Sequence, residues 1–585
     1  MAADRENDDR RQLVELITSY VKTFFKKLCC FNDLKPFLPP VVNANDARIE
    51  LVNNFTTMNN ESAADPTDEL QLRKFIISSQ LLSYLEGTIE DEKLLQNWYA
   101  SLRQLKEGEQ DTQRGDELMQ IYCERKFNVA MDHPADSSSR VSDLIKLAAL
   151  VETCVEKSPF NYHFKLIGLQ VYDKLAAFQR GVGLFNGLEV KNIQLDSMSY
   201  VLLNPLLRSG LFIEASHHTS DIVGMHNQSY RQIGEHLAKG YSNGSYSQIN
   251  DMLEFRKEKM ANSLQLFSSK AFACCLATFQ TEILGEKNGF NGLSEEDCGA
   301  QAAEGEVRGD GERALKLKTM ESVWTHQGLN FRDEKSLSKK LSDNRDFGLN
   351  ASFTCTQRHF NAFESSADVV NGGAILAILH HALVNALAGV EEFKAIKNNK
   401  KQKKKQTVAV LEGISDQLSL LDKYDENALG IVEGGVVLCT TTICSILVAA
   451  DGESDDDAVV ESLNAVSEAV EKFQGAFTRD ASLSSTRPWL YNPEWLARSC
   501  SSIPIFVFFT AAFRGLGKLL KKRKKATLLG DISDKVAGMV TEMVDKFNAL
   551  NEEYQGEERA EIIVAESHTY TRDRIVNILN NYAKQ

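Results

Sequence analysis

One pentapeptide in this sequence has the spacing of a hydrolase nucleophile. Residues 240–244, Gly-Tyr-Ser-Asn-Gly, match the Gly-x-Ser-x-Gly pattern, in which a serine held between a strand and a helix attacks a carbonyl group. The residues before Gly240 have a helical pattern instead, and Gly and Asn are common in turns between helices. We interpret residues 240–244 as a turn, and hydrolysis by Ser242 stays a weaker alternative.

Three Arg-Gly-x-Gly segments could present backbone amides to a nucleotide or to acetyl-CoA. They are residues 180–183, 308–311 and 514–517. The dinucleotide fingerprint needs a strand before the glycines and a small residue three positions after the second glycine. In the first and third segments that position holds Asn186 and Leu520, and the middle segment follows no strand pattern. The sequence therefore predicts no bound cofactor and no catalytic residue.

Histidine side chains could bind a metal ion, and adjacent pairs occur at residues 217–218 and 380–381. Neighbouring side chains point to different sides of a helix, whereas chelation favours an i, i+4 pair with a third ligand. His226 and His236 are ten residues apart and have no cysteine nearby. We predict core or surface positions for the histidines and no metal site.

Two basic runs stand out in an acidic chain. Residues 397–405 and 518–525 each contain six Lys or Arg residues, without the interspersed aromatic side chains that stack on bases. Solvated loops are the first interpretation, and electrostatic contact with RNA phosphates or an acidic partner is the second. The residues that would make this contact are Lys400, Lys401, Lys403, Lys404, Lys405, Lys521, Lys522, Arg523, Lys524 and Lys525.

The composition is that of a large helical protein. The 585 residues are 43% hydrophobic, which is enough for several domains or one long array, and the 10 prolines are few enough to favour helix. The net charge of −15 argues against a protein whose whole surface binds nucleic acid. We therefore expect no DNA partner.

The cysteines and the first residues bear on the compartment. No two of the 11 cysteines form a Cys-x-x-Cys pair, and their odd number and irregular spacing indicate reduced thiols. The acidic N-terminus has no apolar signal core. Residues 434–450 are apolar but short for a membrane span and rich in Thr, so we predict a buried helix there. We expect a cytoplasmic protein without a membrane segment.

Paired amphipathic helices dominate residues 158–279. Their starts recur roughly every 32 to 38 residues, close to the period of tetratricopeptide repeats. We predict helix caps at Ser158 and Asp196, and separate helices over 212–225 and 228–237. Such pairs stack into a superhelix whose long concave surface binds other proteins. The predicted core consists of Phe164, Leu169, Tyr172, Leu195, Tyr200, Leu203 and Leu207.

The predicted fold class is all-α: a right-handed, tetratricopeptide-like helical-repeat superhelix, or α-solenoid. The helical pattern weakens in a glycine- and acid-rich stretch and returns towards the C-terminus. We divide the chain into an N-terminal helical segment (1–135), the helical pairs (136–284), an insert and linker (285–350) and a C-terminal helical region with lysine-rich loops (351–585).

A series of landmarks runs along the first 350 residues. They are residues 29–35 (CCFNDLK), 158–161 (SPFN), the apolar positions between Phe164 and Phe178, residues 191–197 (KNIQLDS), Phe255-Arg256, 262–264 (NSL) and 343–346 (DNRD). In their order and separation they resemble the auxiliary, non-catalytic subunit of the N-terminal acetyltransferase B (NatB) complex. The residues that follow show no such match.

The resemblance implies a helical-repeat scaffold that forms a heterodimer with a small catalytic acetyltransferase subunit. It implies ribosome association, and acetylation by the partner of nascent chains that start with Met-Asp, Met-Glu, Met-Asn or Met-Gln. It also places residues 1–135 in the middle of the family's scaffold, because family members carry further repeats before the Cys-Cys-Phe landmark. The alternative function is a general helical-repeat adaptor of an unrelated assembly.

Overall fold

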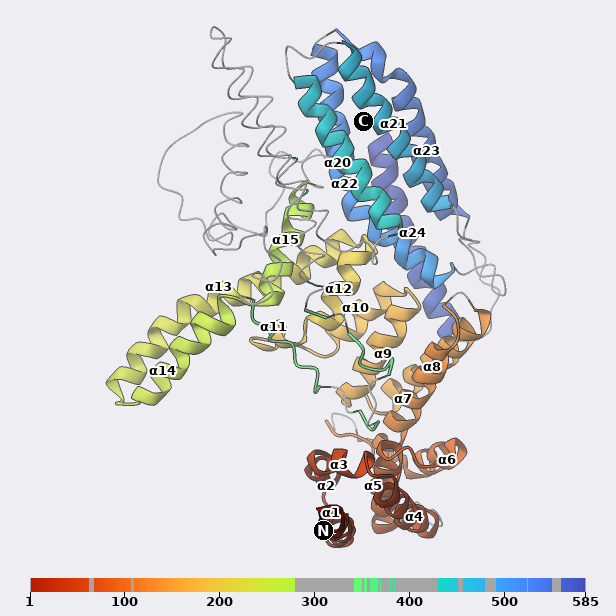
Figure 1. Cartoon of the computed structure of the whole chain (residues 1–585), viewed down its shortest axis with the longest axis vertical. Helices are drawn as coiled ribbons and strands as arrows, with labels where there is room; N and C mark the ends of the chain where they lie inside the picture. Colours follow the sequence, from red (N-terminus) through yellow and green to blue (C-terminus); the bar gives the residue numbers. More distant parts are fainter. Residues whose placement is uncertain are drawn as a thin grey trace.

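The computed structural model describes residues 2–62, 68–106, 110–135, 137–278, 341–349, 352–354, 358–363, 365, 366, 369, 379, 383, 430–450, 456–478, 491–522, 524–549 and 559–583. Within these ranges the regular elements are helices, and Ser263 and Ser342 form an isolated β-bridge. The chain runs from a layer of N-terminal helices through a middle array to a long C-terminal bundle (Figure 1). The all-α prediction is therefore confirmed for the described residues. Residues 285–340 of the predicted insert and linker, and the basic run at 397–405, lie outside them.

The N-terminal helices enclose a core of their own. The elements are α1 (Ala2–Phe24), α2 (Cys30–Leu34), η1 (Lys35–Phe37), α3 (Pro39–Val42), α4 (Asn45–Ser62), α5 (Glu69–Tyr84) and α6 (Asp91–Ser101). Phe31, Phe55 and Phe75 are buried among them. Asp68 caps α5 by accepting a hydrogen bond from the Leu70 amide at 2.8 Å, which satisfies one of the free amides of the first turn.

The middle array continues the stack of helices. Its elements are α7 (Asp116–Asp132), α8 (Ser138–Lys157), α9 (Tyr162–Lys174), α10 (Phe178–Asn186), α11 (Gln194–Met198) and α12 (Tyr200–Ser209). The predicted core residues that are buried here are Phe164, Leu169, Tyr172, Tyr200 and Leu203. Leu195 is only half-buried, because Asp196 and Met198 take the inward positions of α11. The side chain of Leu207 lies outside the described part of the chain.

Both predicted caps of this array are wrong, because their side chains hold other partners. Ser158 is fully buried at the end of α8 and donates its hydroxyl hydrogen to Asp116 Oδ2 at 2.6 Å. Asn161 caps α9 instead, by accepting from the His163 amide at 3.0 Å. Asp196 lies inside α11 with its side chain in the core, and the long helix predicted from there is two helices, α11 and α12.

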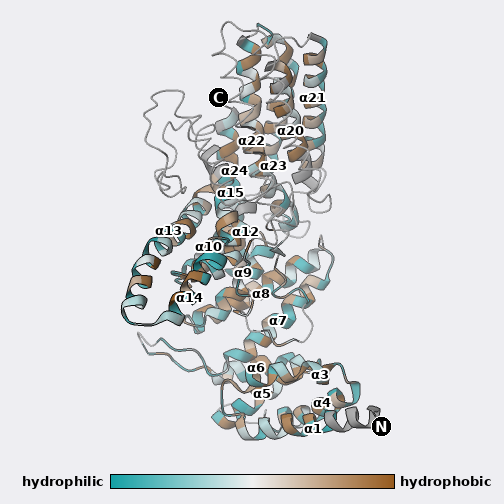
Figure 2. Ribbon diagram, turned by 60° about the vertical axis from the view of Figure 1, so that its left-hand side comes forward, coloured by the Kyte–Doolittle hydropathy of each residue, from teal (hydrophilic) through white to brown (hydrophobic). Residues whose placement is uncertain are grey.

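A hairpin of α13 (Phe212–Ser242) and α14 (Tyr246–Glu254) projects from the array (Figures 1 and 2). The prediction of separate helices over 212–225 and 228–237 is wrong, because no Pro or Gly lies between them and α13 runs through both. The turn predicted over 240–244 is shorter in the structure: residues 240–242 are the last residues of α13, and the chain turns at Asn243 and Gly244, whose φ is +71°. A π-helical turn, η2 (Phe255–Met260), leads to α15 (Leu264–Thr278).

The C-terminal helices form a bundle, in which apolar residues run along α20 and α22 (Figure 2). Its elements are α20 (Gly430–Ala450), α21 (Asp456–Thr478), α22 (Pro493–Lys522), η6 (Ala526–Leu529), α23 (Gly530–Asn548) and α24 (Arg559–Ala583). The predicted buried helix over 434–450 is confirmed on one face, where Leu438, Ile443 and Ile446 are fully buried, whereas Val437 and Cys444 are exposed. Among the described helices, α22 is long and apolar enough to cross a membrane, but 72% of its most apolar window is buried inside the protein.

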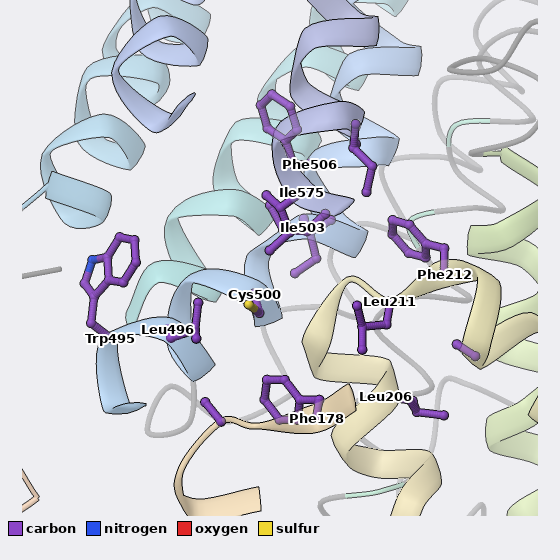
Figure 3. Packing of buried hydrophobic residues seen from close by; sticks show 14 of the residues in the cluster. Phe178, Leu206, Leu211, Phe212, Trp495, Leu496, Cys500, Ile503, Phe506 and Ile575 are labelled. Atoms are coloured by element: carbon purple, nitrogen blue, oxygen red, sulfur yellow. The ribbon is translucent and has the colours of Figure 1, made fainter. Parts of the chain in front are cut away.

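The bundle and the array share one apolar core. Figure 3 shows Phe178 and Leu206 of the array on one side and Ile503 and Ile575 of the bundle on the other. Two hydrogen bonds from α24 secure the same junction: His568 Nε2 donates to the Leu175 carbonyl at 2.7 Å, and the Ser567 hydroxyl accepts from the Gln179 amide at 3.2 Å. The C-terminal helices therefore extend the stack as part of the same body.

An irregular segment from later in the sequence lies against the helices of the array. We call the described residues 341–349, 352–354 and 358–363 the strap. In Figure 1 the strap lies over α11, α9 and α7. At its end the Phe363 ring lies 4.8 Å from the ring of Tyr200 in α12 and 6.1 Å from that of Phe347, so the strap doubles back. The Asp346 amide donates to the Ser197 carbonyl at 3.0 Å, and the Tyr200 hydroxyl donates to the Asp346 carbonyl at 2.8 Å. The strap is thus hydrogen-bonded across the helices instead of forming a sheet.

Candidate functional site

The described landmark residues meet in buried polar junctions between helices. The first junction centres on Asp196, a 1% exposed carboxylate in α11. It accepts hydrogen bonds from His226 Nε2 at 2.8 Å, from Asn344 Nδ2 at 2.7 Å and from the Ser263 hydroxyl. A buried carboxylate is tolerated when donors surround it. Landmarks far apart in the sequence are therefore parts of one junction.

The second junction centres on Asp116 at the start of α7. Its carboxylate accepts from Trp98 Nε1 at 3.2 Å, from the Ser158 hydroxyl at 2.6 Å and from Asn161 Nδ2 at 2.8 Å. Burial is the largest influence on this carboxyl and raises its pKa, although the donors act in the opposite direction. The Ser-Pro-Phe-Asn landmark thus fixes α8 and α9 against α6 and α7.

A third junction ties α8, α9 and α10 together. Glu152 is 4% exposed, accepts from the Tyr172 hydroxyl at 2.7 Å and forms an ion pair with Arg180 through Nε and Nη2 at 2.9 and 2.8 Å. The two parallel bonds give the fork geometry that guanidinium and carboxylate groups prefer. Burial is the main reason that the pKa of Tyr172 lies far above its ordinary value. The hydroxyl therefore stays protonated as a donor.

The Cys-Cys-Phe landmark at α2 is a packing site. Cys30 and Phe31 are buried, and burial raises the pKa of the Cys30 thiol to about 11. The neighbouring Cys29 is exposed, and hydrogen bonding to Asp33 raises the pKa of its thiol. A thiol with a raised pKa is a weak nucleophile, so this pair does not have the electrostatics of a catalytic cysteine.

The groups considered for chemistry lie apart from one another. Ser242 is exposed at the end of α13 and donates to the Lys239 carbonyl at 3.0 Å. His218 packs against Phe185 with ring centroids 4.9 Å apart, and burial lowers the pKa of this histidine to about 4. Among the described residues, no group of three or more His, Cys, Asp or Glu side chains could hold a metal ion.

Part of the second basic run lies at the end of α22. Lys521 and Lys524 are exposed and Lys525 is half-buried. The Lys525 amide donates to the Leu520 carbonyl at 2.9 Å, and Lys524 has φ +61°, so the chain turns here. The predicted contact residues Lys400, Lys401, Lys403, Lys404, Lys405 and Arg523 lie outside the described part, as does the side chain of Lys522. The electrostatic role of both runs stays a prediction.

The sequence patterns missed one site, the polar inner row on α7 and α9 that receives the strap. Glu124, Asn128 and Gln170 are buried, and each accepts a hydrogen bond from a backbone amide of the strap. A signal was present, because polar residues at i and i+4 of a helix that is otherwise apolar on that face need buried partners. The partner could not be found from the helix itself, since it comes from more than 200 residues away.

Comparison with known proteins agrees with this arrangement. Residues 1–347 match the family model of the N-acetyltransferase B complex (NatB) non-catalytic subunit, which is more than half of the 585 residues. The match contains all the landmark segments and the junctions that they form. It ends within the strap, before the C-terminal bundle begins.

Curated relatives align with a shorter part of the chain. The phagocyte signaling-impaired protein of Drosophila pseudoobscura pseudoobscura is 28% identical over 261 residues, covering 43% of this chain and 26% of that protein. The human N-alpha-acetyltransferase 25, NatB auxiliary subunit, is 25% identical over 260 residues, covering 43% of this chain and 26% of the human protein. The chain spans about a quarter of the length of these relatives.

The fold is similar to that of a chain in the solved structure "The NatB Acetyltransferase Complex Bound To bisubstrate inhibitor". The TM-score is 0.52 at 14% sequence identity, and the superposition covers 99% of this chain and 75% of the other. The predicted helical-repeat superhelix is thereby confirmed, C-terminal bundle included. With residues 1–347 matching the family model, the chain belongs to the family of non-catalytic subunits of the N-acetyltransferase B complex.

Proposed function

We propose that this chain is the scaffold of a NatB-like complex, in which it binds a catalytic acetyltransferase subunit as a heterodimer. In this proposal it positions the catalytic subunit at cytoplasmic ribosomes, where nascent chains starting with Met-Asp, Met-Glu, Met-Asn or Met-Gln are acetylated. The family match over residues 1–347 is the observation that carries the proposal. Acetyl transfer itself is assigned to the partner, because the family is non-catalytic.

The architecture suits a scaffold. A helical array presents a long surface whose shape is set by how each helix packs on the next. The junctions at Asp116, Glu152 and Asp196 fix that packing, because each joins three or more elements through directed hydrogen bonds. A surface held in this way loses little conformational entropy when a partner binds, which favours tight association.

A pull-down with reconstituted activity tests the proposal. The tagged chain is co-expressed with the NatB catalytic subunit of the same organism, and peptides starting Met-Asp and Met-Leu are offered with acetyl-CoA. We expect a heterodimer that acetylates the Met-Asp peptide faster than the catalytic subunit alone does, and that leaves the Met-Leu peptide unmodified. If the catalytic subunit does not co-purify at cytosolic salt, the adaptor alternative replaces this proposal.

Ribosome positioning has a separate test in the basic runs. Replacing Lys521 and Lys524 by Gln, together with the five lysines of the 400–405 run, removes charge that would face RNA phosphates. We expect the complex to co-sediment less with ribosomes at low salt. The matched control replaces Lys146 and Lys191, whose side chains are each 70% exposed, and should leave co-sedimentation unchanged. Equal co-sedimentation of all three proteins would refute the electrostatic contact.

A further inference from the structure

Buried side chains accept hydrogen bonds from the backbone of the strap. Glu124 Oε2 accepts from the Phe353 amide at 2.8 Å, and Asn128 Oδ1 accepts from the amides of His359 and Phe360 at 3.1 and 3.0 Å. Glu124 and Asn128 are one helical turn apart on α7 and are 1% and 5% exposed. Both acceptors therefore lie on one covered face of the helix.

The neighbouring helix α9 continues this row. Gln170 Oε1 accepts from the Asn361 amide at 2.8 Å, and Gln170 Nε2 donates to Asn361 Oδ1 at 2.9 Å. Backbone amides that are buried away from water need partners, and a segment that joins neither a helix nor a sheet must find them elsewhere. Side chains of α7 and α9 supply the acceptors that a neighbouring strand would otherwise provide.

Two aromatic anchors hold the strap beside these hydrogen bonds. Phe353 and Phe360 are each 3% exposed. The Phe353 ring lies 5.4 Å from the ring of Phe31, and the Phe360 ring lies 5.8 Å from the ring of Phe127. Buried aromatic anchors next to main-chain hydrogen bonds are the usual means by which protein surfaces hold extended peptides.

We propose that α7 and α9 form a binding groove for a polypeptide segment with two phenylalanines seven residues apart and a turn at the second one, and that the strap is its tethered occupant. Four hydrogen bonds go to backbone amides of the strap, and Ser352, Thr354 and Asn361 add hydrogen bonds from their side chains. A segment of another protein with the same spacing would compete with the strap. The strap thus closes the groove until it is displaced.

A peptide added to the full chain tests the proposal. The probe is a fluorescein-labelled peptide with the sequence of residues 350–363, and its anisotropy is followed with the wild type and with a Phe353→Ala/Phe360→Ala double variant. We expect binding to the double variant at least tenfold tighter than to the wild type, whose own strap occupies the groove. Adding Asn128→Ala to the double variant should weaken that binding, whereas adding the control Asn54→Ala, an exposed position on α4, should not.

The proposal is overturned if the peptide binds neither chain, or binds both equally. Should the double variant fail to fold, hydrogen exchange in the otherwise intact chain decides the question. The amides of Phe353, Phe360 and Asn361 should be protected in the wild type, and Asn128→Ala should accelerate exchange at Phe360 at least tenfold while Asn54→Ala leaves it unchanged. Unprotected amides at all three positions in the wild type would show that the strap does not occupy the groove.

Discussion

His226 Nε2 donates a hydrogen bond to Asp196 Oδ1 at 2.8 Å, and the two side chains are 5% and 1% exposed. This pair joins α11 to the long helix α13. The Asn344 and Ser263 side chains donate to the same carboxylate, so one residue holds the strap and the start of α15 as well. The pair of His226 and Asp196 is one of the contacts that anchor α13 to the array, beside the packing of His218 against Phe185.

Replacing the Asp196 acceptor should destabilise the protein strongly. Asp196→Ala leaves the buried donors His226 and Ser263 without their acceptor and Asn344 with the Lys259 carbonyl alone, and we expect a loss of about 3 to 5 kcal/mol in the free energy of unfolding. Asp143→Ala is the matched control, because Asp143 forms a partly exposed pair with Lys146 and should cost less than about 1 kcal/mol. Chemical denaturation followed by circular dichroism measures both. Equal losses in the two variants would contradict the role of Asp196.

The ion pair of Glu152 and Arg180 gives a second prediction. In Arg180→Met the 4% exposed carboxylate of Glu152 loses its ion pair and keeps the hydrogen bond from the Tyr172 hydroxyl. We expect this to lower the free energy of unfolding by about 3 to 5 kcal/mol. Arg180→Lys should restore only part of the loss, because an ammonium group cannot form both parallel bonds. Thermal unfolding should rank the wild type as the most stable protein, Arg180→Lys second and Arg180→Met last.

The control for this ion pair is Lys174→Met. Lys174 forms an ion pair with Asp173 at the end of α9, and this ion pair is more exposed than that of Glu152 and Arg180. The Lys174→Met variant should unfold close to the wild-type temperature. An Arg180→Met variant as stable as this control would show that the fork geometry contributes little. Tyr172→Phe should fall between the two, because it removes one hydrogen bond of about 1 to 2 kcal/mol while the ion pair remains.

The helical class and much of the core could be predicted from the sequence, because apolar periodicity depends on neighbours along one helix. Phe164 and Tyr172 are buried where the pattern placed them. The caps failed for a physical reason: Ser158 and Asp196 have the side chains that cap helices, but buried tertiary partners bind them instead. Propensity describes the isolated helix and does not include such partners.

The strap contacts and the position of the C-terminal bundle could not be predicted in this way. Glu124 finds its partner in Phe353, and Leu175 finds His568, at separations of several hundred residues. Local patterns carry no information about which distant segment satisfies a buried polar group. The landmark series still identified the family, because the buried junctions restrict which residues can stand at those positions and so leave a recognisable order along the chain.

Acid should weaken the contact between the bundle and the array. Burial lowers the pKa of His568 to about 4, whereas an unfolded histidine titrates near 6.5. As the pH falls, the unfolded state therefore takes up a proton before the folded state does. The contribution of neutral His568 to the free energy of unfolding is complete above pH 6.5 and is lost as the pH falls towards 4. At pH 5 the loss from this histidine is about 2 kcal/mol.

A substitution isolates this effect from other groups that titrate in the same range. His568→Gln keeps an amide hydrogen for the Leu175 carbonyl but cannot be protonated, so its unfolding temperature should fall less than that of the wild type between pH 7 and pH 5. His217→Gln is the control, because His217 is exposed on α13 and should leave the pH dependence unchanged. Identical pH dependence in all three proteins would exclude His568 as the origin.

The last prediction concerns the turn between α12 and α13, where the array meets the bundle. Gly210 has φ +68°, and a Cβ atom there would lie 3.5 Å from Ile503 and Ile575, which is ordinary van der Waals contact. Gly210→Ala should therefore act through the backbone, at a cost of about 1 to 2 kcal/mol for the left-handed conformation.

The control is Gly224→Ala, inside α13 with no atom within 4 Å of the added Cβ. It should instead raise stability by up to about 1 kcal/mol. Opposite shifts in the midpoint of thermal unfolding are the expected result. A loss of stability in both variants would contradict this account, because no atom lies within 4 Å of the Cβ added at Gly224.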